Sequence, residues 1–478
     1  MEQMEHFLHP QNRNSQKLFW LLFLPLVAAS RVPFFFNGFG SDEDAWRVAR
    51  AAASIHRTGV YEASRFPGYP LYEYLSSLVI PFGGATLSNI LTCCAGLAAL
   101  FVWYRIVRRS NNWKILLVAL AFSPLFWINS SITLEHVWSL LFLLLAVCFA
   151  ERHRSLLAGL ALGLSAGFRP TNLLALGPVL ILVMDNAQHL RKGITTTAAA
   201  LVVLLLAFFP VWSHYGVEHW LSLTGDQAAR TSVHALDRIP LFLYRSVYAI
   251  GPAAMIVAAS ILFLHRKPIW NRFRLKEPRI VACAAGIILY GVLFFIFPLE
   301  GSYLLPATTF LFLFLDQVSS RRLLVLFTAG LLSFSFVNPD VVKHASPRGK
   351  PGINIHAGLV FQEFDMRAAQ SRRRSEILEH EYAPSTVVMT GMEESLTFDQ
   401  PLLARDAEEP WISLHEKSFH LVGREDVHFI QLLSSAEISR LQVQGYNITC
   451  LSFSSKYIEQ QIGESLTDRA VTIIPLNE

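Results

Sequence analysis

The chain has little charge and few cysteines for its length. Of its 478 residues, 16% are charged, 53% are hydrophobic and five are cysteine, and the mean hydropathy is +0.38. Soluble domains carry about 25% charged residues, because most of their surface meets water. The composition therefore excludes a soluble globular protein and indicates a polytopic α-helical membrane protein.

The charge balance and the low cysteine content exclude two further classes of protein. The 40 basic residues barely outnumber the 36 acidic ones and fall in short loops rather than along one stripe, which excludes nucleic-acid binding and is typical of topology signals. Four cysteines lie in apolar runs and Cys450 stands alone in a polar region. No disulfide framework or Cys/His metal cluster is therefore predicted.

Apolar runs of membrane length recur through the first 337 residues. About 20 apolar residues cross the hydrocarbon core as a helix. Residues 156–184 form two shorter runs broken at Gly167-Phe168-Arg169-Pro170, which predicts a hairpin entering from one side. The segment 71–82 is also short and is expected at the interface. The remaining predicted spans are 18–36, 87–107, 115–130, 137–150, 194–213, 247–264, 280–297, 304–315 and 323–337. We therefore expect about nine to eleven membrane helices.

The basic loops predict the orientation. If the N-terminus with Arg13 and Lys17 is cytoplasmic, every short basic loop falls on that same side, as the positive-inside rule requires. These loops lie at 105–114, 152–154, 191–192, 266–279 and 321–322. The first outer loop (37–86), the loop at 214–246 and everything after residue 338 are then extracytoplasmic.

The composition divides the chain into two domains. Residues 1–337 form the predicted transmembrane domain. Residues 338–478 are richer in charge and are predicted to form a small soluble α/β domain. Its expected helices are 364–382 and 434–444, and its expected strands are 386–389, 427–432, 447–451 and 470–474. This region has no Gly-x-Gly-x-x-Gly and no phosphate loop, so no nucleotide site is predicted there.

An acidic turn follows the first span and opens the first outer loop. It starts a stretch, 42–58, that is predicted to form an amphipathic interfacial helix ended by Gly59. Carboxylates can accept a proton and guanidinium groups can bind an anion, so both kinds of group are gathered at one membrane depth. The residues concerned are Asp42, Glu43, Asp44, Arg47 and Arg50.

Helix capping is the structural alternative for the acids. Ser41 and Asp44 have the spacing of a capping box, and acids in a first turn favour the positive end of the helix dipole. From this loop alone, catalysis and capping are equally compatible with the sequence.

Two other features point to a phosphate. Arg169 interrupts the apolar hairpin, where an arginine costs about 2.5 kcal/mol or more on insertion scales unless it finds a partner or water. It is predicted to bind a phosphate; the alternative is a structural pairing with a backbone carbonyl or with Glu135. The turn at 298–306 carries Glu300 and Tyr303 between two spans.

The order of these features resembles the GT-C superfamily of polyprenyl-phosphate-sugar-dependent glycosyltransferases. Asp42-Glu43 resembles the Asp-Glu pair that begins the first loop of protein O-mannosyltransferases and aminoarabinose lipid A transferases. The stretch from Arg65 to Tyr74, with Pro67-Gly68-Tyr69-Pro70, is similar to the proline-rich end of that loop. Asp44-Ala45-Trp46, followed by Arg50, instead resembles oligosaccharyltransferase catalytic subunits. The position of the general base therefore stays open between Asp42 and Asp44.

Further motifs follow in the same order. Phe168-Arg169-Pro170-Thr171 resembles the Arg-Pro-Thr hairpin of bacterial members, and residues 300–306 are similar to the Tyr-Leu-Leu-Pro stretch that the family places near the lipid phosphate. The Trp-Trp-Asp motif of oligosaccharyltransferases is absent, which argues against transfer to asparagine. Gly-Tyr-Pro replaces the lysine or proline pair of the aminoarabinose enzymes, which leaves that acceptor unsupported.

The resemblance implies a GT-C-like fold and an inverting, single-displacement transfer at the extracytoplasmic face of a bacterial cytoplasmic membrane. The donor would be a polyprenyl-phosphate-linked sugar, and the acceptor a lipid, a glycan or a protein. Asp42 or Asp44 would be the base, and Arg169 with Tyr303 would hold the phosphate. The full set of implied substrate-binding residues is Glu43, Arg47, Arg50, Arg65, Tyr69, Arg169, Glu300 and Tyr303.

A cofactor is not implied, although carboxylates at a phosphate site attract hard cations and leave a divalent metal open as an alternative. Two rival functions also stay open. A transporter or lipid flippase is compatible with Arg169 in a broken helix, and a scaffold could bind a partner through its C-terminal domain.

Overall fold

The computed structural model describes residues 10–184, 189–230, 235–298, 301–342, 352–391, 403–405, 418–452 and 454–475. The chain splits into two compact units. The first comprises Met1–Phe36 and Ala51–Phe364, and the second comprises Asn37–Arg50 and Asp365–Glu478. The division after Phe364 lies beyond the change in composition at residue 338, because the first unit also includes a short β-hairpin.

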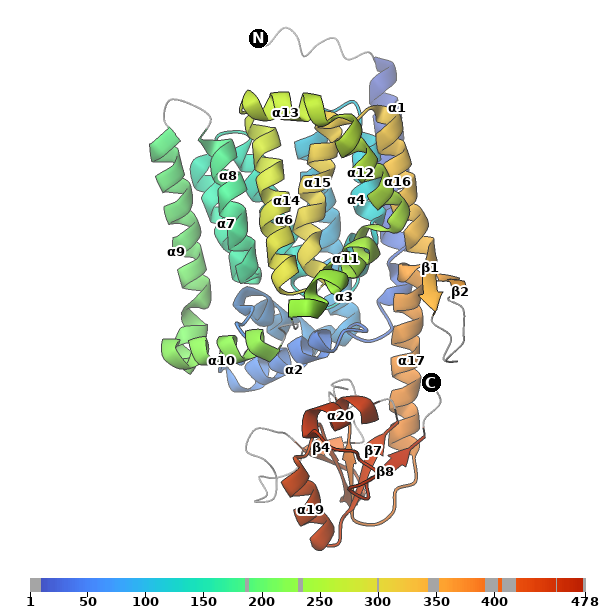
Figure 1. Ribbon diagram of the computed structural model, residues 1–478. Helices are drawn as coiled ribbons and strands as arrows, with labels where there is room; N and C mark the ends of the chain where they lie inside the picture. Colours follow the sequence, from blue (N-terminus) through green and yellow to red (C-terminus); the bar gives the residue numbers. More distant parts are fainter. Residues whose placement is uncertain are drawn as a thin grey trace. The chain divides into compact units, whose positions relative to one another are not determined.

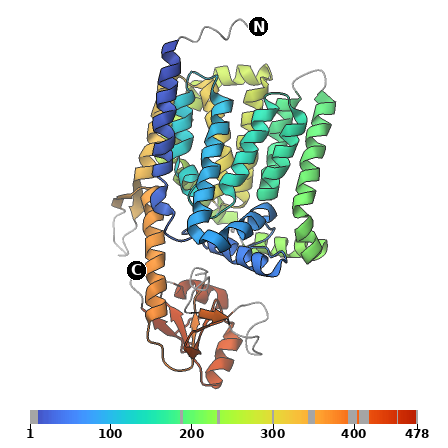
Figure 2. The same ribbon diagram turned by 180° about the vertical axis from the view of Figure 1, so that it is seen from behind.

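The first unit is a helical bundle (Figure 1, and from behind in Figure 2). Its longer helices are α1 (Pro10–Ala29), α3 (Pro70–Val107), α4 (Trp113–Phe122), α6 (His136–Ala150), α7 (Ser155–Phe168), α8 (Leu176–Val183), α9 (His189–Tyr215), α10 (Val217–Arg230), α11 (Ala235–Ile250), α12 (Pro252–Leu264), α13 (Arg266–Arg274), α14 (Pro278–Ile296), α15 (Leu304–Val318) and α16 (Arg321–Phe336). Short elements join them: η2 (Val32–Phe34), α5 (Pro124–Asn129), η3 (Pro170–Ala175), η4 (Gly301–Tyr303) and the hairpin of β1 (Val337–Val342) and β2 (Gly352–Ala357). Helices α2 (Glu43–Thr58) and α17 (Leu359–Glu379) cross the division between the units.

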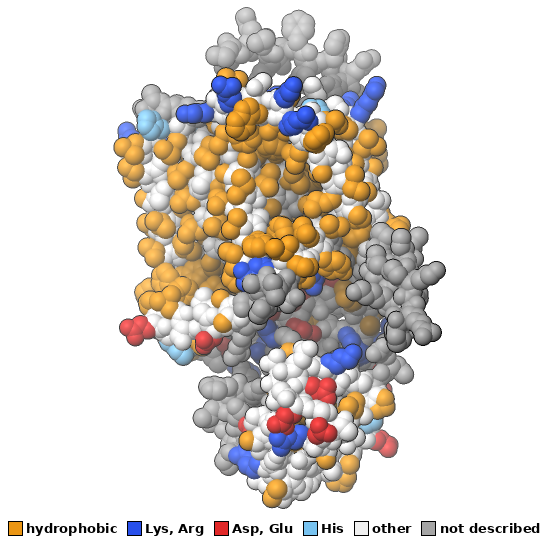
Figure 3. All heavy atoms as spheres, viewed as in Figure 1, with side chains coloured by type: hydrophobic (Ala, Val, Ile, Leu, Met, Phe, Trp, Pro, Cys, Tyr) orange, Lys and Arg blue, Asp and Glu red, His pale blue; other side chains and the backbone are white. Residues whose placement is uncertain are grey.

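The bundle has the surface of a membrane protein. Hydrophobic side chains cover its flank, and Lys and Arg side chains gather at the end where α13 lies (Figure 3). Four helical segments of the described chain are long and apolar enough to cross a membrane: Gln16–Phe34, Pro70–Val107, His189–Tyr215 and Pro278–Ile296. Shorter apolar helices pack among them, at Trp113–Phe122, His136–Ala150, Ser155–Phe168 and Pro170–Val183. The predicted polytopic α-helical fold class is confirmed.

Some predicted spans are broken by proline. The span predicted at 115–130 is wrong as one helix, because Ser123 adopts an extended ψ of 138° before Pro124, and α4 ends there. A second break occurs at Gly251-Pro252, where a bend of 98° separates the segments Arg238–Val247 and Pro252–Leu264. Gly251 has a φ of +89°, and a Cβ on it would lie 2.8 Å from Phe334 Cβ, so glycine is required at this bend.

The outer loop predicted at 214–246 is also wrong as a loop. In its described residues the chain forms the helices α10 and α11. The apolar face of α10 includes Trp220, which packs with Phe208 and Trp212 of α9. Burial of these aromatic rings gives a polar segment enough apolar contact to fold as a helix.

The predicted break in the hairpin lies at Arg169. Helix α7 ends at Phe168, Arg169 is extended (φ −150°, ψ 105°), and η3 and α8 follow. Glycines let α7 pack tightly against α9. A Cβ on Gly159 would lie 2.4 Å from the carbonyl oxygen of Thr196, and one on Gly163 would lie 2.6 Å from Val203 Cβ. This packing fixes the position of Arg169 at the chain break.

The second unit contains the predicted small α/β domain, which is confirmed. Its mixed sheet has the order β4-β5-β6-β3-β7-β8, in which β3 pairs parallel with β6 and β7, β7 with β8, and the β4-β5-β6 edge is antiparallel. The strands are β3 (Thr386–Met389), β4 (Leu403–Arg405), β5 (Phe419–Leu421), β6 (Arg424–Ile430), β7 (Asn447–Leu451) and β8 (Thr472–Ile474), and the helices after β6 are α19 (Ser435–Val443) and α20 (Ser455–Ile462). A capping box between Ser434 and Glu437 begins α19. The short elements β4, β5 and α20 were not predicted.

Candidate functional site

A buried carboxylate between two arginines is the centre of the candidate site in the first unit. Glu135, which precedes α6, is fully buried. Arg65 Nη2 donates to both of its carboxylate oxygens, at 2.9 and 3.1 Å. Arg169 Nη1 donates to Glu135 Oε1 at 2.5 Å. The hairpin break and the loop before α3 therefore meet at one carboxylate, and we call Arg65, Glu135 and Arg169 the arginine–glutamate cluster.

Aromatic rings flank the two guanidinium groups. Arg65 Cζ lies 4.2 Å from the centre of the Tyr69 ring, and Arg169 Cζ lies 4.6 Å from that of Tyr303 and 5.9 Å from that of Tyr69. Such rings orient a cation without neutralising it. Burial raises the pKa of the Tyr69 phenol, although Arg65 lowers it. Tyr69 therefore stays protonated and can donate a hydrogen bond.

His136 adds no charge to the cluster. Its Nδ1 lies 2.7 Å from Arg169 Nη1. Because a guanidinium group can only donate, this nitrogen must accept, and the imidazole is neutral. Two buried arginines therefore converge on Glu135 beside a neutral imidazole. All three side chains are at most 8% exposed. Guanidinium groups in such a place need anionic or polar partners, because little water is available to solvate them.

Glu73 holds the loop that carries Arg65 and Tyr69. It lies in the first turn of α3 and is fully buried. Its Oε1 accepts from the backbone nitrogen and the hydroxyl of Ser64 at 2.7 and 2.6 Å. Its Oε2 accepts from the Tyr69 backbone nitrogen at 3.1 Å and from the Tyr61 hydroxyl. Four donors from one loop thus converge on one carboxylate, which fixes the path of residues 61–69.

The packing of α9 and α10 supports the same loop from another direction. The Ala63 backbone nitrogen donates to the Tyr215 hydroxyl at 3.1 Å, and Trp220 Nε1 donates to the Pro67 carbonyl oxygen at 2.7 Å. The loop is therefore anchored on three helices, although it has no regular secondary structure.

The acidic turn belongs to the second unit. Asp42 Oδ1 accepts from the Asp44 backbone nitrogen at 2.9 Å, so Asp42 rather than Ser41 is the N-cap of α2. Asp44 Oδ1 pairs with Arg47 Nη1 at 3.2 Å. Glu43 Oε1 accepts from Gln370 Nε2 of α17 at 2.9 Å. Capping thus operates at Asp42, and the base is not assigned between Asp42 and Asp44.

The predicted site residues therefore divide into two groups. The first unit brings together Arg65, Tyr69, Arg169 and Tyr303. The second unit holds Asp42, Glu43, Asp44, Arg47 and Arg50. Glu300 lies outside the described residues.

Sequence reasoning missed Glu73 and gave Glu135 only a structural part. The signal for both was a carboxylate at the edge of an apolar run, in a chain that has few charges. In the described parts of the chain, no group of three or more His, Cys, Asp or Glu side chains could hold a metal ion.

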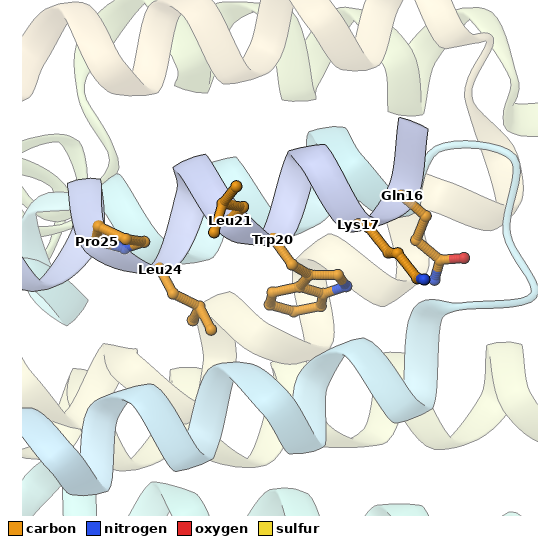
Figure 4. A pocket seen from close by; sticks show the side chains of 6 residues that line it. All are labelled: Gln16, Lys17, Trp20, Leu21, Leu24 and Pro25. Carbon is orange, nitrogen blue, oxygen red and sulfur yellow. The ribbon is translucent and has the colours of Figure 1, made fainter. Parts of the chain in front are cut away.

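A cavity of about 630 Å³ lies along α1 (Figure 4). It is lined by Gln16, Lys17, Trp20, Leu21, Leu24 and Pro25. This lining is mostly apolar and contains none of the predicted site residues.

Comparisons with known proteins bear on the fold and the class of protein. The model of glycosyltransferase family 87 matches residues 74–301, just under half of the chain. No curated protein sequence matches. Among solved structures, ArnT from Cupriavidus metallidurans bound to undecaprenyl phosphate is 14% identical, with a TM-score of 0.46. The same protein in the apo state is 15% identical, with a TM-score of 0.44.

The match to each ArnT structure covers 63% of this chain and 60% of that protein. The chain thus spans somewhat less than two thirds of its length. The family match includes Glu135, His136 and Arg169 but ends before Tyr303. Over residues 74–301 the chain is similar to glycosyltransferase family 87, which confirms the resemblance to a glycosyltransferase that the sequence motifs predict.

Proposed function

We propose that the protein transfers a sugar from a polyprenyl-phosphate-linked donor to an acceptor at the extracytoplasmic face of the membrane, by an inverting single displacement. The observation that carries this proposal is the buried arginine–glutamate cluster, in which two guanidinium groups from separate parts of the chain converge beside Tyr69 and Tyr303. The match to glycosyltransferase family 87 over residues 74–301 supports the class of reaction.

The leaving group requires a positive site. As the bond between the anomeric carbon and the phosphate oxygen breaks, the bonding electrons move to that oxygen and its charge increases. Arg65 and Arg169 are held by Glu135 before the phosphate arrives, so they need little rearrangement when the charge develops. Fixed donors of this kind stabilise a transition state more than flexible surface lysines do.

The attacking group requires a proton acceptor. In the proposed mechanism the acceptor hydroxyl loses its proton to Asp42 or Asp44 while its oxygen attacks the anomeric carbon from the face opposite the phosphate. The product is an inverted glycoside, and the lipid phosphate leaves. Tyr69 and Tyr303 orient the two guanidinium groups.

A transporter is the second candidate, since a buried cation beside a broken helix also suits the passage of an anion. The similarity to a glycosyltransferase family favours the transferase. Detection of sugar transfer by the purified protein would separate the two.

The proposal is tested by the binding of undecaprenyl phosphate to the full chain in nanodiscs. We expect Arg169→Gln to weaken binding about 10- to 100-fold, because a hydrogen bond to a charged group is worth about 1.5–3 kcal/mol. The variant should also be less stable, because Glu135 loses one of its two partners.

A double variant separates the two effects. Glu135→Gln combined with Arg169→Gln removes one negative and one positive charge, so we expect the unfolding temperature to recover, while the affinity stays low because the Arg169 guanidinium donors are absent. Arg266→Gln, an exposed position on α13, is the matched control and should bind as the wild type does. Wild-type affinity in the stable double variant would contradict the proposed phosphate site.

A further inference from the structure

A second polar cavity lies at the far end of the helices that carry the arginine–glutamate cluster. Helix α6 begins at His136, beside the cluster, and ends at Ala150; its 15 residues correspond to about 22 Å along the helix axis. At that end a cavity of about 440 Å³ lies among the C-terminal ends of α3, α6 and α8 and the start of α14. The two sites therefore lie at opposite ends of α6.

Arginine dominates the lining of this cavity. Three chain segments supply its charged side chains: Arg105, Arg108, Arg109, Glu151, Arg152 and Arg279. Glu151 is already engaged, because its Oε1 pairs with Arg279 Nε at 3.0 Å. Five guanidinium groups and one carboxylate leave four positive charges in excess. Such charges repel one another unless an anion lies between them.

The positive-inside rule explains why arginines occur in these loops, but it does not require them to surround one cavity. The basic residues at the start of α16, Arg321 and Arg322, follow the same rule and do not line it. The gathering of Arg105, Arg109 and Arg152 around one cavity is therefore a separate observation that calls for a ligand.

The surroundings of the cavity suit a lipid. Ile106 and Leu182 contribute apolar lining. Phe101 lies one helical turn before Arg105, so it occupies the same face of α3, and it is 54% exposed. An acyl chain can run along this face while its headgroup enters the cavity. A soluble phosphate would make no use of these apolar groups.

We propose that this cavity binds the phosphate-bearing headgroup of an anionic membrane lipid, in the leaflet opposite the arginine–glutamate cluster. Basic pockets between membrane helices at the positive end of a bundle have the charge and depth for such headgroups. The site would anchor the ends of α3, α6 and α14 to the membrane surface. It does not depend on the proposed transfer reaction.

The test uses the full chain in phosphatidylcholine nanodiscs with increasing amounts of phosphatidylglycerol, and it counts retained phosphatidylglycerol by native mass spectrometry. Each arginine near an anionic lipid contributes about five-fold in affinity. The variant Arg105→Gln/Arg109→Gln should therefore bind phosphatidylglycerol about 30-fold more weakly. Both side chains are exposed, so the fold should be unaffected.

The matched control is Arg321→Gln/Arg322→Gln, which removes the same charge at exposed positions away from the cavity. We expect less than about a two-fold change. If both double variants weakened phosphatidylglycerol binding equally, the effect would be one of general surface charge, and the proposed site would be wrong. Unchanged binding in Arg105→Gln/Arg109→Gln would overturn it as well.

A second arm distinguishes lipid from soluble phosphate. Pyrophosphate is titrated into the detergent-solubilised protein, with and without phosphatidylglycerol. Displacement of pyrophosphate by phosphatidylglycerol supports the lipid assignment. Saturable pyrophosphate binding that phosphatidylglycerol does not displace would mean that the cavity takes a soluble phosphate, and the lipid assignment would be wrong.

Discussion

Glu135 illustrates how one buried carboxylate gathers two arginines into a site. It is surrounded by donors, since Arg65 and Arg169 both donate to it. Removing one partner of a buried ion pair typically costs 3–5 kcal/mol, because the other charge is left without compensation. A purely structural pair would need only one arginine. The second arginine adds a second buried set of guanidinium donors beside Tyr69 and Tyr303, which is why we propose an anion site here.

Arg31 provides an instructive contrast within the same unit. It is also fully buried, but its guanidinium group donates to the carbonyl oxygens of Val27 and Ala121 and to the hydroxyls of Ser30 and Ser130. Val27 lies in α1 and Ala121 in α4, while Ser30 and Ser130 directly follow α1 and α5, so all four partners are neutral groups of the fold. A buried arginine can therefore be structural, and the surroundings of Arg169 are what distinguish it.

The identity of the general base is decided at the level of single residues. Asparagine caps helices as well as aspartate does, so Asp42→Asn should retain the cap on α2. Asp44→Asn loses one partly exposed ion pair with Arg47, which is worth about 0.2–1 kcal/mol. Neither change should unfold the protein, so a large loss of activity in either variant would be chemical in origin.

We expect one of the two variants to lose several orders of magnitude in turnover, measured as sugar release from polyprenyl-phosphate donors, because a general base contributes about 10²–10⁴-fold. Glu218→Gln, an exposed acid on α10, is the control and should keep full turnover. Unchanged rates in both Asp42→Asn and Asp44→Asn would remove the carboxylates from the mechanism.

At the scale of elements, the loop at 61–69 and the hairpin of α7 and α8 position their arginines by different means. The hairpin places Arg169 through helix packing, since glycines on α7 allow close contact with α9. The loop places Arg65 through hydrogen bonds to Glu73. The helix packing depends on side-chain shape, and the loop depends on the Glu73 carboxylate. Substitutions should therefore affect the two arrangements differently.

The variant Glu73→Gln tests the hydrogen bonds that hold the loop at 61–69. The glutamine amide keeps the size of the side chain but replaces one acceptor oxygen with a donor, so at least one of the four loop donors loses its partner. We expect undecaprenyl phosphate to bind about 10-fold more weakly because Arg65 is no longer held in place, with a smaller effect in Tyr61→Phe, which removes a single bond.

Ser77→Ala is the matched control for Glu73→Gln. Ser77 is buried on the same helix, and its hydroxyl donates to the Tyr74 carbonyl oxygen within its own turn. It should change stability slightly and leave binding unaffected. If Glu73→Gln lowered the unfolding temperature and left the affinity at the wild-type value, Glu73 would serve the fold alone.

At the scale of the whole molecule, the asymmetry of charge predicts orientation. Basic residues gather at the end of the bundle where α13 lies (Figure 3). We predict a cytoplasmic N-terminus and an extracytoplasmic C-terminus, because cytoplasmic loops retain Lys and Arg. Green fluorescent protein fused to the N-terminus should fluoresce, and alkaline phosphatase fused after residue 478 should be active in the periplasm of a bacterial host.

The exchanged fusions provide the control for this prediction. Alkaline phosphatase at the N-terminus should be inactive, and green fluorescent protein exported at the C-terminus should be dark. Active phosphatase at both ends would mean that the predicted number of membrane crossings is wrong by an odd number. Such an error could arise at the broken segments, for example around Ser123-Pro124 or Gly251-Pro252, where helix length alone does not define a crossing.

The sequence by itself determined the fold class and the general position of the chemistry. Apolar runs, basic loops and turn residues act locally, so they predicted a helical membrane protein, the break at Arg169 and the strands β3 and β7 without tertiary information. Regions with weaker local signals were predicted incorrectly. The polar sequence of α10 predicts a loop, and the helix is stabilised only by tertiary packing, such as that of the Trp212 and Trp220 rings.

Only the tertiary structure decided which charged groups meet. Arg65, Glu135 and Arg169 are separated by 70 and 34 positions along the chain, and no local pattern encodes such a pairing. The same holds for Glu73, which looks like an ordinary first-turn acid until four donors converge on it. Burial turns these separate residues into a site, because charges removed from water must find partners or a ligand.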